Sequence, residues 1–277
     1  MSASPRAERF RRRQQAHFEA LADAYADEAA AFDVHSESLF RRFLAVTAPP
    51  PGGHLLEIGA GGGRYTVPLL RAGYRVDAVD LSARALGRLA ARAAADGVAD
   101  RLRTILGDAE TVGLADHYDL VYGIHLLHHV PDPVVMLRAM ARAARPGGVV
   151  ACLEPNPLNP AWYVYITLDR LRSWRVEYGM LRGFPWQVSR AFRRAGLARV
   201  TRHMYGAVPI SLVNRSRRWL ALEEAVHGAP GLRLACAVQI VRGVRGGGVT
   251  SRGRREGAAA APGPRSTRAG VGRSDLP

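Results

Sequence analysis

Short apolar runs alternate with helix-like segments along residues 54–153. The runs are HLLEIG, RVDAVD, RLRTILGD, YDLVYG and GVVACLE. Each has the length of a buried strand, and the segments between them repeat apolar residues every three to four positions, as amphipathic helices do. Strands that alternate with helices indicate a parallel sheet with helices on both faces. We therefore expect an α/β, Rossmann-like, doubly wound fold.

The hydrophobic pattern predicts further elements on either side of this region. Residues 14–46 have the apolar spacing of two helices, and PPPGG then ends them. Residues 155–190 break the alternation of strands and helices and hold three of the four Trp. Downstream we expect two more helices and two more strands, at 187–195, 198–206, 212–227 and 232–242.

Positive charge is concentrated at the two ends of the chain. The formal net charge is +15, and residues 1–13 and 242–277 together supply ten of these charges. The C-terminal part is rich in Gly, Pro, Ser and Arg and offers little that a core could bury. We expect a flexible basic segment at 1–13, one folded domain at 14–242 and a disordered tail at 243–277.

This charge distribution argues against nucleic acid as a partner. The middle of the chain is only mildly basic, and residues 242–277 contain no aromatic side chain on which a base could stack. No apolar run approaches the ~20 residues of a membrane span, and no apolar segment of a secretion signal follows the basic N-terminus. Cys152 and Cys236 lie in separate apolar runs, as reduced core residues do. We expect a cytoplasmic protein.

A cluster of glycines follows the first predicted strand, in the stretch LLEIGAGGGRYT. Gly59, Gly61 and Gly63 alternate after Glu57, which gives the pattern E-x-G-x-G-x-G. Glycine reaches positive φ without strain and leaves no Cβ between the backbone and a ligand. A strict dinucleotide-binding turn would have glycine at position 64, where this chain has Arg64. The cluster predicts either a ligand site built on the backbone or simply a tight strand-to-helix turn.

Two acids stand at the ends of the next two predicted strands. Asp80 ends RVDAVD, and Asp108 follows RLRTILG. The carboxyl ends of parallel strands meet at one edge of the sheet, where ligands bind in open α/β folds. A carboxylate at the tip of the second strand can accept both hydroxyls of a ribose. The alternative for each acid is a helix cap or a solvated strand end.

Five motifs occur in an order and spacing that resemble a known family. They are EIGAGGG, VDAVDLS, GDAE, YDLVYGIHLLHHVPDP and RPGG. The set resembles the class I S-adenosylmethionine-dependent methyltransferases of the UbiE-like, type 11 group, over roughly residues 14–242. The resemblance implies a seven-stranded, mostly parallel sheet with an antiparallel last strand, and S-adenosylmethionine as cofactor. It places the cofactor half at 50–153, a cap for the acceptor at 155–190, and RPGG in the turn before the fifth strand.

The same resemblance implies a role for the residues at the strand tips. Glu57 and the glycine turn would lie against the methionyl part of the cofactor. Asp80 would hold the ribose, Leu81 would pack on the adenine, and Asp108 would receive the adenine amino group. The full set of implied cofactor-binding residues is Glu57, Gly59, Ala60, Gly61, Gly63, Asp80, Leu81, Asp108, Ala109, Gly123 and Ile124.

Four residues are candidates for the chemistry. Methyl transfer needs a base only when the acceptor must lose a proton. The resemblance favours His128 or His129, and because adjacent residues on a helix point about 100° apart, we expect at most one of them to face the site. Glu154 ends the fifth strand at the ligand edge, and Tyr25 lies in a segment that would close over the cofactor. The alternatives are packing or capping for the histidines, a bond to backbone N–H for Glu154, and a core position for Tyr25.

The remaining predictions concern metals, the acceptor and other functions. We predict no metal site, because His128, His129 and Asp132 cannot bring three ligands together without a distant residue. The aromatic cap suits a small, largely apolar or aromatic acceptor, a secondary metabolite, quinone or lipid methylated at O or C. Trp and Tyr interleaved with Arg at 160–184 also suit peripheral contact with a membrane. Two alternatives stay open: a regulatory protein that binds the cofactor without catalysis, and a nucleic-acid methyltransferase, which the charge layout disfavours.

Overall fold

The structure of the chain is a computed structural model that describes residues 5–30, 32–114, 117–169, 174–227, 231 and 236–247, without the side chains of 6–7 and 21–30. Within these ranges, no helix combines the length and the apolar character needed to cross a bilayer. The tail is expected at 243–277; its part from residue 248 onward and the side chain of Tyr25 lie outside the described residues.

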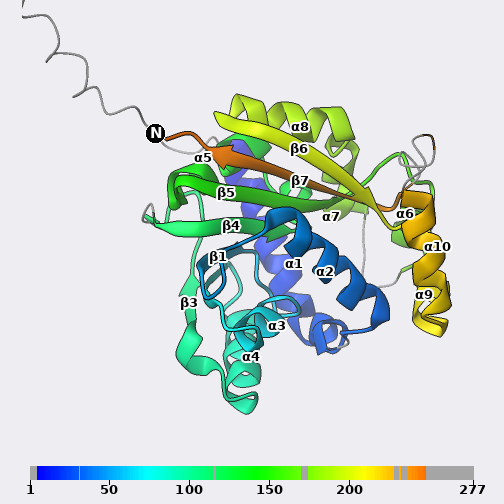
Figure 1. Ribbon diagram of the computed structural model, residues 1–277. Coiled ribbons are helices and arrows are strands. Elements are labelled where there is room, and N and C mark those ends of the chain that lie inside the picture. The colour runs from blue at the N-terminus through cyan, green and yellow to red at the C-terminus, as the bar shows by residue number, and fades with distance from the viewer. Residues whose placement is uncertain are drawn as a thin grey trace, which may run out of the picture. The chain divides into compact units, whose positions relative to one another are not determined.

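A single seven-stranded sheet organises the described residues (Figure 1). Its spatial order is β3-β2-β1-β4-β5-β7-β6, and β7 pairs antiparallel with both β5 and β6. This confirms the expected mostly parallel sheet with an antiparallel last strand. The strands are β1 (His54–Ile58), β2 (Arg75–Asp80), β3 (Leu102–Leu106), β4 (Tyr118–Ile124), β5 (Ala144–Pro155), β6 (Leu197–Tyr205) and β7 (Val238–Arg245).

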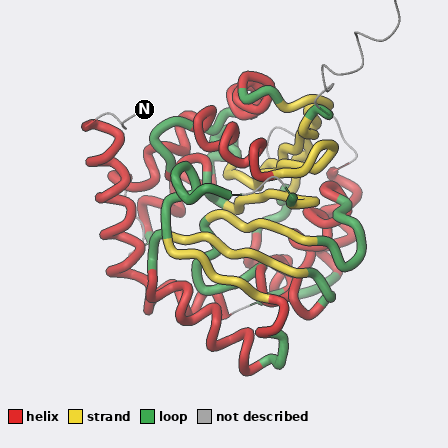
Figure 2. The backbone as a smooth tube through the Cα atoms, turned by 90° about the vertical axis from the view of Figure 1, so that its left-hand side faces the viewer, coloured by secondary structure: helices red, strands yellow, loops and turns green. Residues whose placement is uncertain are grey.

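Helices lie on both sides of the strands (Figure 2). The α-helices are α1 (Pro5–Ala30), α2 (Val34–Thr47), α3 (Thr66–Arg71), α4 (Ala83–Ala95), α5 (Pro133–Ala143), α6 (Ala161–Leu168), α7 (Trp174–Glu177), α8 (Pro185–Arg194), α9 (Ile210–Arg215) and α10 (Arg218–His227). The described residues also form the 3₁₀ turns η1 (Ala99–Arg101), η2 (Leu127–His129) and η3 (Tyr178–Arg182).

Successive residues of the central strands face opposite sides of the sheet, because side chains in a strand alternate with a period of two. Leu56 and Val121 belong to one hydrophobic cluster, whereas their neighbours Leu55 and Leu120 belong to another. All four are completely buried. Both faces of the sheet are therefore apolar, which is why the strands read as continuous hydrophobic runs rather than as an alternating pattern.

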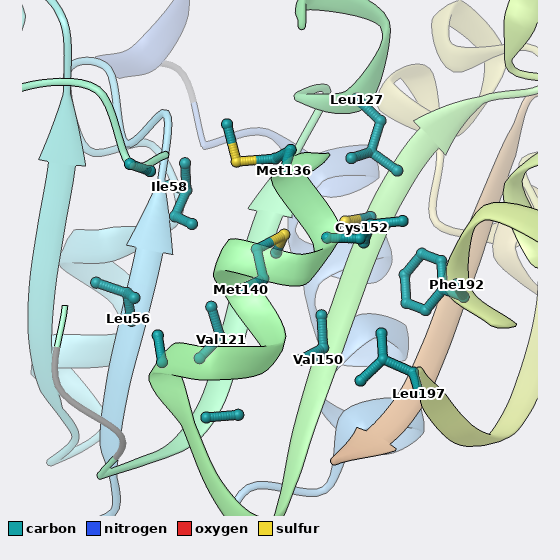
Figure 3. Close-up of a cluster of buried hydrophobic side chains, with 14 of the residues drawn as sticks. Leu56, Ile58, Val121, Leu127, Met136, Met140, Val150, Cys152, Phe192 and Leu197 are labelled. Carbon is teal, nitrogen blue, oxygen red and sulfur yellow. The ribbon is translucent and has the colours of Figure 1, made fainter. Parts of the chain in front are cut away.

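Helices close each of these two clusters. Met136 and Met140 of α5 pack over the first face together with Phe192 of α8, as Figure 3 shows. Phe43 of α2 and the Leu69–Leu70 pair of α3 pack on the second face. Burial of each such side chain contributes about 1.5–3 kcal/mol, and the resulting frame holds the carboxyl ends of β1, β2, β3 and β4 in fixed positions.

The structure differs from the sequence expectation at three boundaries. Helix α1 begins at Pro5, inside the segment expected to be flexible, because Arg11 pairs with Asp108 and anchors it. Strand β7 begins at Val238 and continues to Arg245, beyond the expected end at 242, because Gly243 and Val244 pair with β5. The RPGG motif lies within β5, at a break in its pairing with β4, rather than before that strand.

Candidate functional site

The glycine turn that follows β1 has the backbone conformation that only glycine adopts readily. Gly59, Gly61 and Gly63 have φ of 76°, 53° and 82°. A Cβ on Gly61 would meet no atom within 4 Å, whereas one on Gly63 would lie 2.4 Å from Leu89 of α4. Gly63 therefore lets α4 pack against the turn, and Gly61 leaves open space beside the backbone.

Asp80 at the tip of β2 is fixed by backbone donors. Its Oδ2 accepts the N–H of Gly61 at 2.8 Å, and its Oδ1 accepts the N–H of Ser82 at 2.9 Å. Burial raises the pKa of Asp80, and these N–H groups act in the opposite direction. A carboxylate has about four lone-pair positions, so after these two bonds each oxygen retains one for a further donor such as a hydroxyl.

Glu57 lies beneath the turn as a buried acid. Its Oε2 accepts the hydroxyls of Thr66, at 2.5 Å, and of Tyr122, at 2.8 Å. These bonds tie β1 to α3 and to β4, so in this structure Glu57 supports the turn from below. Burial is the largest cause that raises the pKa of Glu57 to about 7.

This raised pKa predicts a pH-dependent stability. In the unfolded chain Glu57 ionises near its ordinary value of 4.5, whereas in the folded protein it stays protonated to about 7. It therefore contributes stability at low pH that is lost as the pH rises from 4.5 to 7. Glu57→Gln keeps an oxygen for Thr66 and Tyr122 and cannot ionise, so it should be about as stable as the parent at pH 4.5 and about 3 kcal/mol more stable at pH 8.

Denaturant unfolding of both proteins at the two pH values measures this difference. Asp96→Ala, which removes a partly exposed acid that pairs with Arg71 after the end of α4, serves as the control and should differ from the parent equally at both pH values. An equal effect of Glu57→Gln at pH 4.5 and pH 8 would contradict the prediction.

Asp108, after β3, is contacted by helix α1. Its Oδ1 accepts the N–H of Glu110 at 2.9 Å, and its Oδ2 lies 2.9 Å from Nε of Arg11. Arg11 also contacts Glu110, and Gln15 donates to the carbonyl of Leu81 at 3.2 Å. The N-terminal helix therefore covers the tips of β2 and β3, a contact that the sequence did not indicate.

The backbone turn after β4 lies directly beside the glycine turn. Leu126 Cδ1 is 3.5 Å from the place a Cβ of Gly59 would take, and a Cβ on Gly123 would lie 2.4 Å from Leu126. His125 has a φ of 54° and donates its N–H to the carbonyl of Leu153. The predicted pair Gly123 and Ile124 thus ends β4 where the two turns meet.

Glu154 holds this second turn in place. Its Oε1 accepts the N–H groups of Leu126 and Leu127, at 2.9 and 2.7 Å, and its Oε2 lies 2.7 Å from Nδ1 of His128. Glu154 is 2% exposed. Its position at the sheet edge is as predicted, and its partners are those of the alternative interpretation, in which it binds backbone N–H.

His128 lies between two buried carboxylates. Besides Glu154 on one side, Oε2 of Glu177 lies 3.4 Å from its Nε2. Burial lowers the pKa of His128, but Glu154 and Glu177 outweigh burial and raise it to about 9. In this arrangement His128 holds a proton at neutral pH and is not ready to accept one.

The two adjacent histidines do not point apart. Their ring centroids lie 3.9 Å from each other, and Nε2 of His129 lies 3.8 Å from the same Glu177 oxygen. The pair lies in the 3₁₀ turn η2 rather than in a regular α-helix, and both rings lie beside Glu177. Glu177 was not among the predicted residues, since nothing in its local sequence marks it.

Comparison with known proteins supports the assignment of the fold. A family model described as a methyltransferase domain matches residues 56–152. Ubiquinone biosynthesis O-methyltransferase of Aeromonas salmonicida is 33% identical over 117 residues, 42% of this chain and 49% of that protein. The Pseudomonas aeruginosa protein of the same name is 30% identical over 155 residues, 55% of this chain and 66% of that protein.

The similarity extends further in structure than in sequence. A solved S-adenosylmethionine-dependent methyltransferase from Thermotoga maritima has a TM-score of 0.57 at 19% identity, over 84% of this chain and 99% of that one. The chain spans about half the length of the first curated relatives it matches. Sheet order, glycine turn and matched domain agree: the chain belongs to the class I S-adenosylmethionine-dependent methyltransferases, whose methyl donor is S-adenosylmethionine.

Proposed function

We propose that the chain transfers a methyl group from S-adenosylmethionine to a small, largely apolar or aromatic acceptor. The observation that carries the proposal is the 2.8 Å bond from Gly61 N–H to Asp80, which joins the ribose-binding acid to the glycine turn. The cofactor's methionyl part would then lie along Gly59 and Gly61, and its methyl group would point toward the turn at 125–129. The aligned relatives are named O-methyltransferases, which favours oxygen over carbon as the methylated atom.

A cavity between α1 and α7 is the proposed place of the acceptor. It has a volume of about 470 Å³ and is lined by Arg13, His17, Arg175 and Val176. Val176 and the aliphatic stems of the arginines offer an apolar wall, while the guanidinium groups favour a negative charge. An aromatic hydroxyl compound that carries a carboxylate combines both properties.

Two measurements test the proposed function. Calorimetric titration with S-adenosylhomocysteine should show micromolar binding, and the same titration with NAD should show none. Transfer of labelled methyl from S-adenosylmethionine should then occur to hydroxybenzoates more readily than to uncharged phenols. Absence of S-adenosylhomocysteine binding would overturn the proposal.

The state of His128 favours a second candidate, a regulatory protein that binds the cofactor without catalysis. Because a carboxylate lies beside each ring nitrogen of His128, its imidazole is not poised to take a proton from an acceptor. Tight S-adenosylhomocysteine binding, together with no turnover on a broad panel of hydroxyl, carbon and amine acceptors, would support this function instead.

Arg11 should slow entry of the cofactor if Asp108 receives the adenine. The Arg11 side chain, which is 23% exposed, pairs with the Asp108 carboxylate that would receive the adenine amino group. Arg11→Ala should therefore raise the association rate of S-adenosylhomocysteine several-fold, as measured by stopped-flow fluorescence. Arg12→Ala is the matched control, because Arg12 pairs with Glu8 at the solvent-exposed side of the same helix. A lower rate in Arg11→Ala than in Arg12→Ala would mean that Arg11 helps to form the site.

Peripheral membrane contact remains a proposal, now centred on α6. Val164, Tyr165 and Leu168 of this helix are 58%, 42% and 75% exposed, an unusual concentration of apolar surface. The protein should sediment with anionic lipid vesicles, and Leu168→Glu should reduce the bound fraction several-fold. Leu222→Glu, at an exposed apolar position of α10, should leave binding unchanged. Equal binding of the two variants would contradict this role for α6.

A further inference from the structure

Three side chains of types that commonly bind metals meet where α7 contacts η2. His128 and His129 come from η2, and Glu177 is the last residue of α7. Nε2 of His128 lies 3.4 Å from Oε2 of Glu177, Nε2 of His129 lies 3.8 Å from it, and the three donor atoms lie within 4.8 Å of one another. Ligand atoms about 2.0–2.2 Å from a tetrahedral zinc ion are roughly 3.3–3.6 Å apart. The distances to Glu177 are thus close to those of a zinc site.

The contacts around His128 resemble the outer support of a metal ligand. Histidines that bind metals usually donate their second ring N–H to a carboxylate, which fixes the tautomer and the orientation of the ring. Glu154 accepts from Nδ1 of His128 at 2.7 Å, so Nε2 is the nitrogen directed toward Glu177. Glu154 is itself held by two backbone N–H groups. The supporting carboxylate therefore cannot turn away from the ring without losing those bonds.

The backbone keeps the third ligand close to the first two. A Cβ on Gly179, in η3, would lie 1.8 Å from the carbonyl oxygen of His128. Only glycine allows this approach, and it places η3 and the adjoining Glu177 directly against η2. Rigid neighbouring elements of this kind are what a site needs to hold ligands in a fixed geometry.

The charge of the cluster also suits a divalent cation. Glu154 and Glu177 are 2% and 4% exposed and lie on opposite sides of the His128 ring, and buried carboxylates are costly unless cations neutralise them. The second group of His and acid residues in the described chain, His54, Asp77 and His117, has a different environment. There the guanidinium of Arg103 lies 3.6 Å from Asp77, and His117 is exposed. That group is less suited to a cation and provides a control.

We propose that His128, His129 and Glu177 bind a divalent transition metal ion of the zinc type, with Glu154 as the supporting carboxylate. Three protein ligands leave one position of a tetrahedral ion open, the arrangement of catalytic rather than structural zinc. The pKa of an acceptor hydroxyl that occupies this position would be lowered, so its proton would pass to water. Its oxygen would then bond to the methyl carbon as the S–CH₃ bond of S-adenosylmethionine breaks, which leaves S-adenosylhomocysteine. The metal would then replace a general base, and this use of the site rests on the proposed methyl transfer, whereas the metal site itself does not.

Calorimetric titration of the chelator-treated full chain with Zn²⁺ tests the metal site without any acceptor. The parent should bind one equivalent tightly. Glu177→Gln and His129→Ala should each weaken that binding at least 10-fold, and Glu154→Gln should do so by about 10–100-fold. His54→Ala, which removes a ligand from the control group, should leave the affinity unchanged. Co²⁺ bound to the parent should give the intense visible absorption of a tetrahedral ion, and Glu177→Gln should lose it.

Two results would overturn the metal site: no stoichiometric Zn²⁺ binding by the parent, or equal loss of affinity in His54→Ala and Glu177→Gln. Circular dichroism and S-adenosylhomocysteine titration on every variant separate these results from failure of the proposed function. A variant that keeps its fold and S-adenosylhomocysteine binding while losing Zn²⁺ locates the metal in this cluster. Loss of S-adenosylhomocysteine binding by the parent itself would overturn the proposed function and leave the Zn²⁺ result standing.

Discussion

Glu154→Ala is expected to lower the free energy of unfolding by about 3–5 kcal/mol. The carboxylate accepts the N–H groups of Leu126 and Leu127 and contacts Nδ1 of His128. Alanine would leave three donors without an acceptor at a site that water does not reach. His128 would also lose one of the two carboxylates beside its positive charge. Urea unfolding at pH 7, followed by tryptophan fluorescence, measures the loss.

Glu224→Ala is the matched control for this prediction. Glu224 pairs with Arg42 and its side chain is 61% exposed, and exposed ion pairs contribute at most about 1 kcal/mol. Glu154→Gln should fall between the two, because its amide oxygen can still accept the backbone N–H groups while its NH₂ faces the N–H of His128. If Glu154→Ala costs no more than Glu224→Ala, the turn at 125–129 is not held by this carboxylate.

The fold could be predicted from the sequence because its signals are local. Each central strand is buried on both faces and so appears as an uninterrupted apolar run, and the helices between strands keep their own period. Pairing such as that of Leu56 with Asp77 and Val121 follows from the right-handed connections of parallel strands. The position of α1 could not be read this way, since it depends on the distant partner of Arg11.

The site was predictable only where it lies at strand ends. The positions of Asp80 and Asp108 could be predicted because they stand at the ends of β2 and β3, and parallel strands bring their carboxyl ends to one edge of the sheet. Glu177 belongs to a short helix far along the chain, and no spacing links it to His128. The choice between catalysis and support at Glu154 also needed the structure, because the same position at a strand end allows either.

Asp80→Ala is expected to weaken S-adenosylhomocysteine binding roughly 100-fold, about 2.7 kcal/mol, measured by calorimetric titration. If Asp80 accepts the ribose hydroxyls, its removal loses hydrogen bonds to a charged acceptor, and the loss of one such bond already costs about 1.5–3 kcal/mol. It also releases the N–H groups of Gly61 and Ser82. The turn that lies along the cofactor is then less well ordered before binding, which adds to the loss.

Asp80→Asn separates these two effects, because an amide oxygen can still hold one N–H of the turn while the negative charge is gone. We expect it to lose about 10-fold, between the parent and alanine. Asp96→Ala is the control: it removes an acid that pairs with Arg71. The affinity of this variant for S-adenosylhomocysteine should equal that of the parent. If Asp80→Ala and Asp96→Ala bind S-adenosylhomocysteine equally, Asp80 serves only to shape the glycine turn. The ribose must then be held elsewhere on the sheet edge.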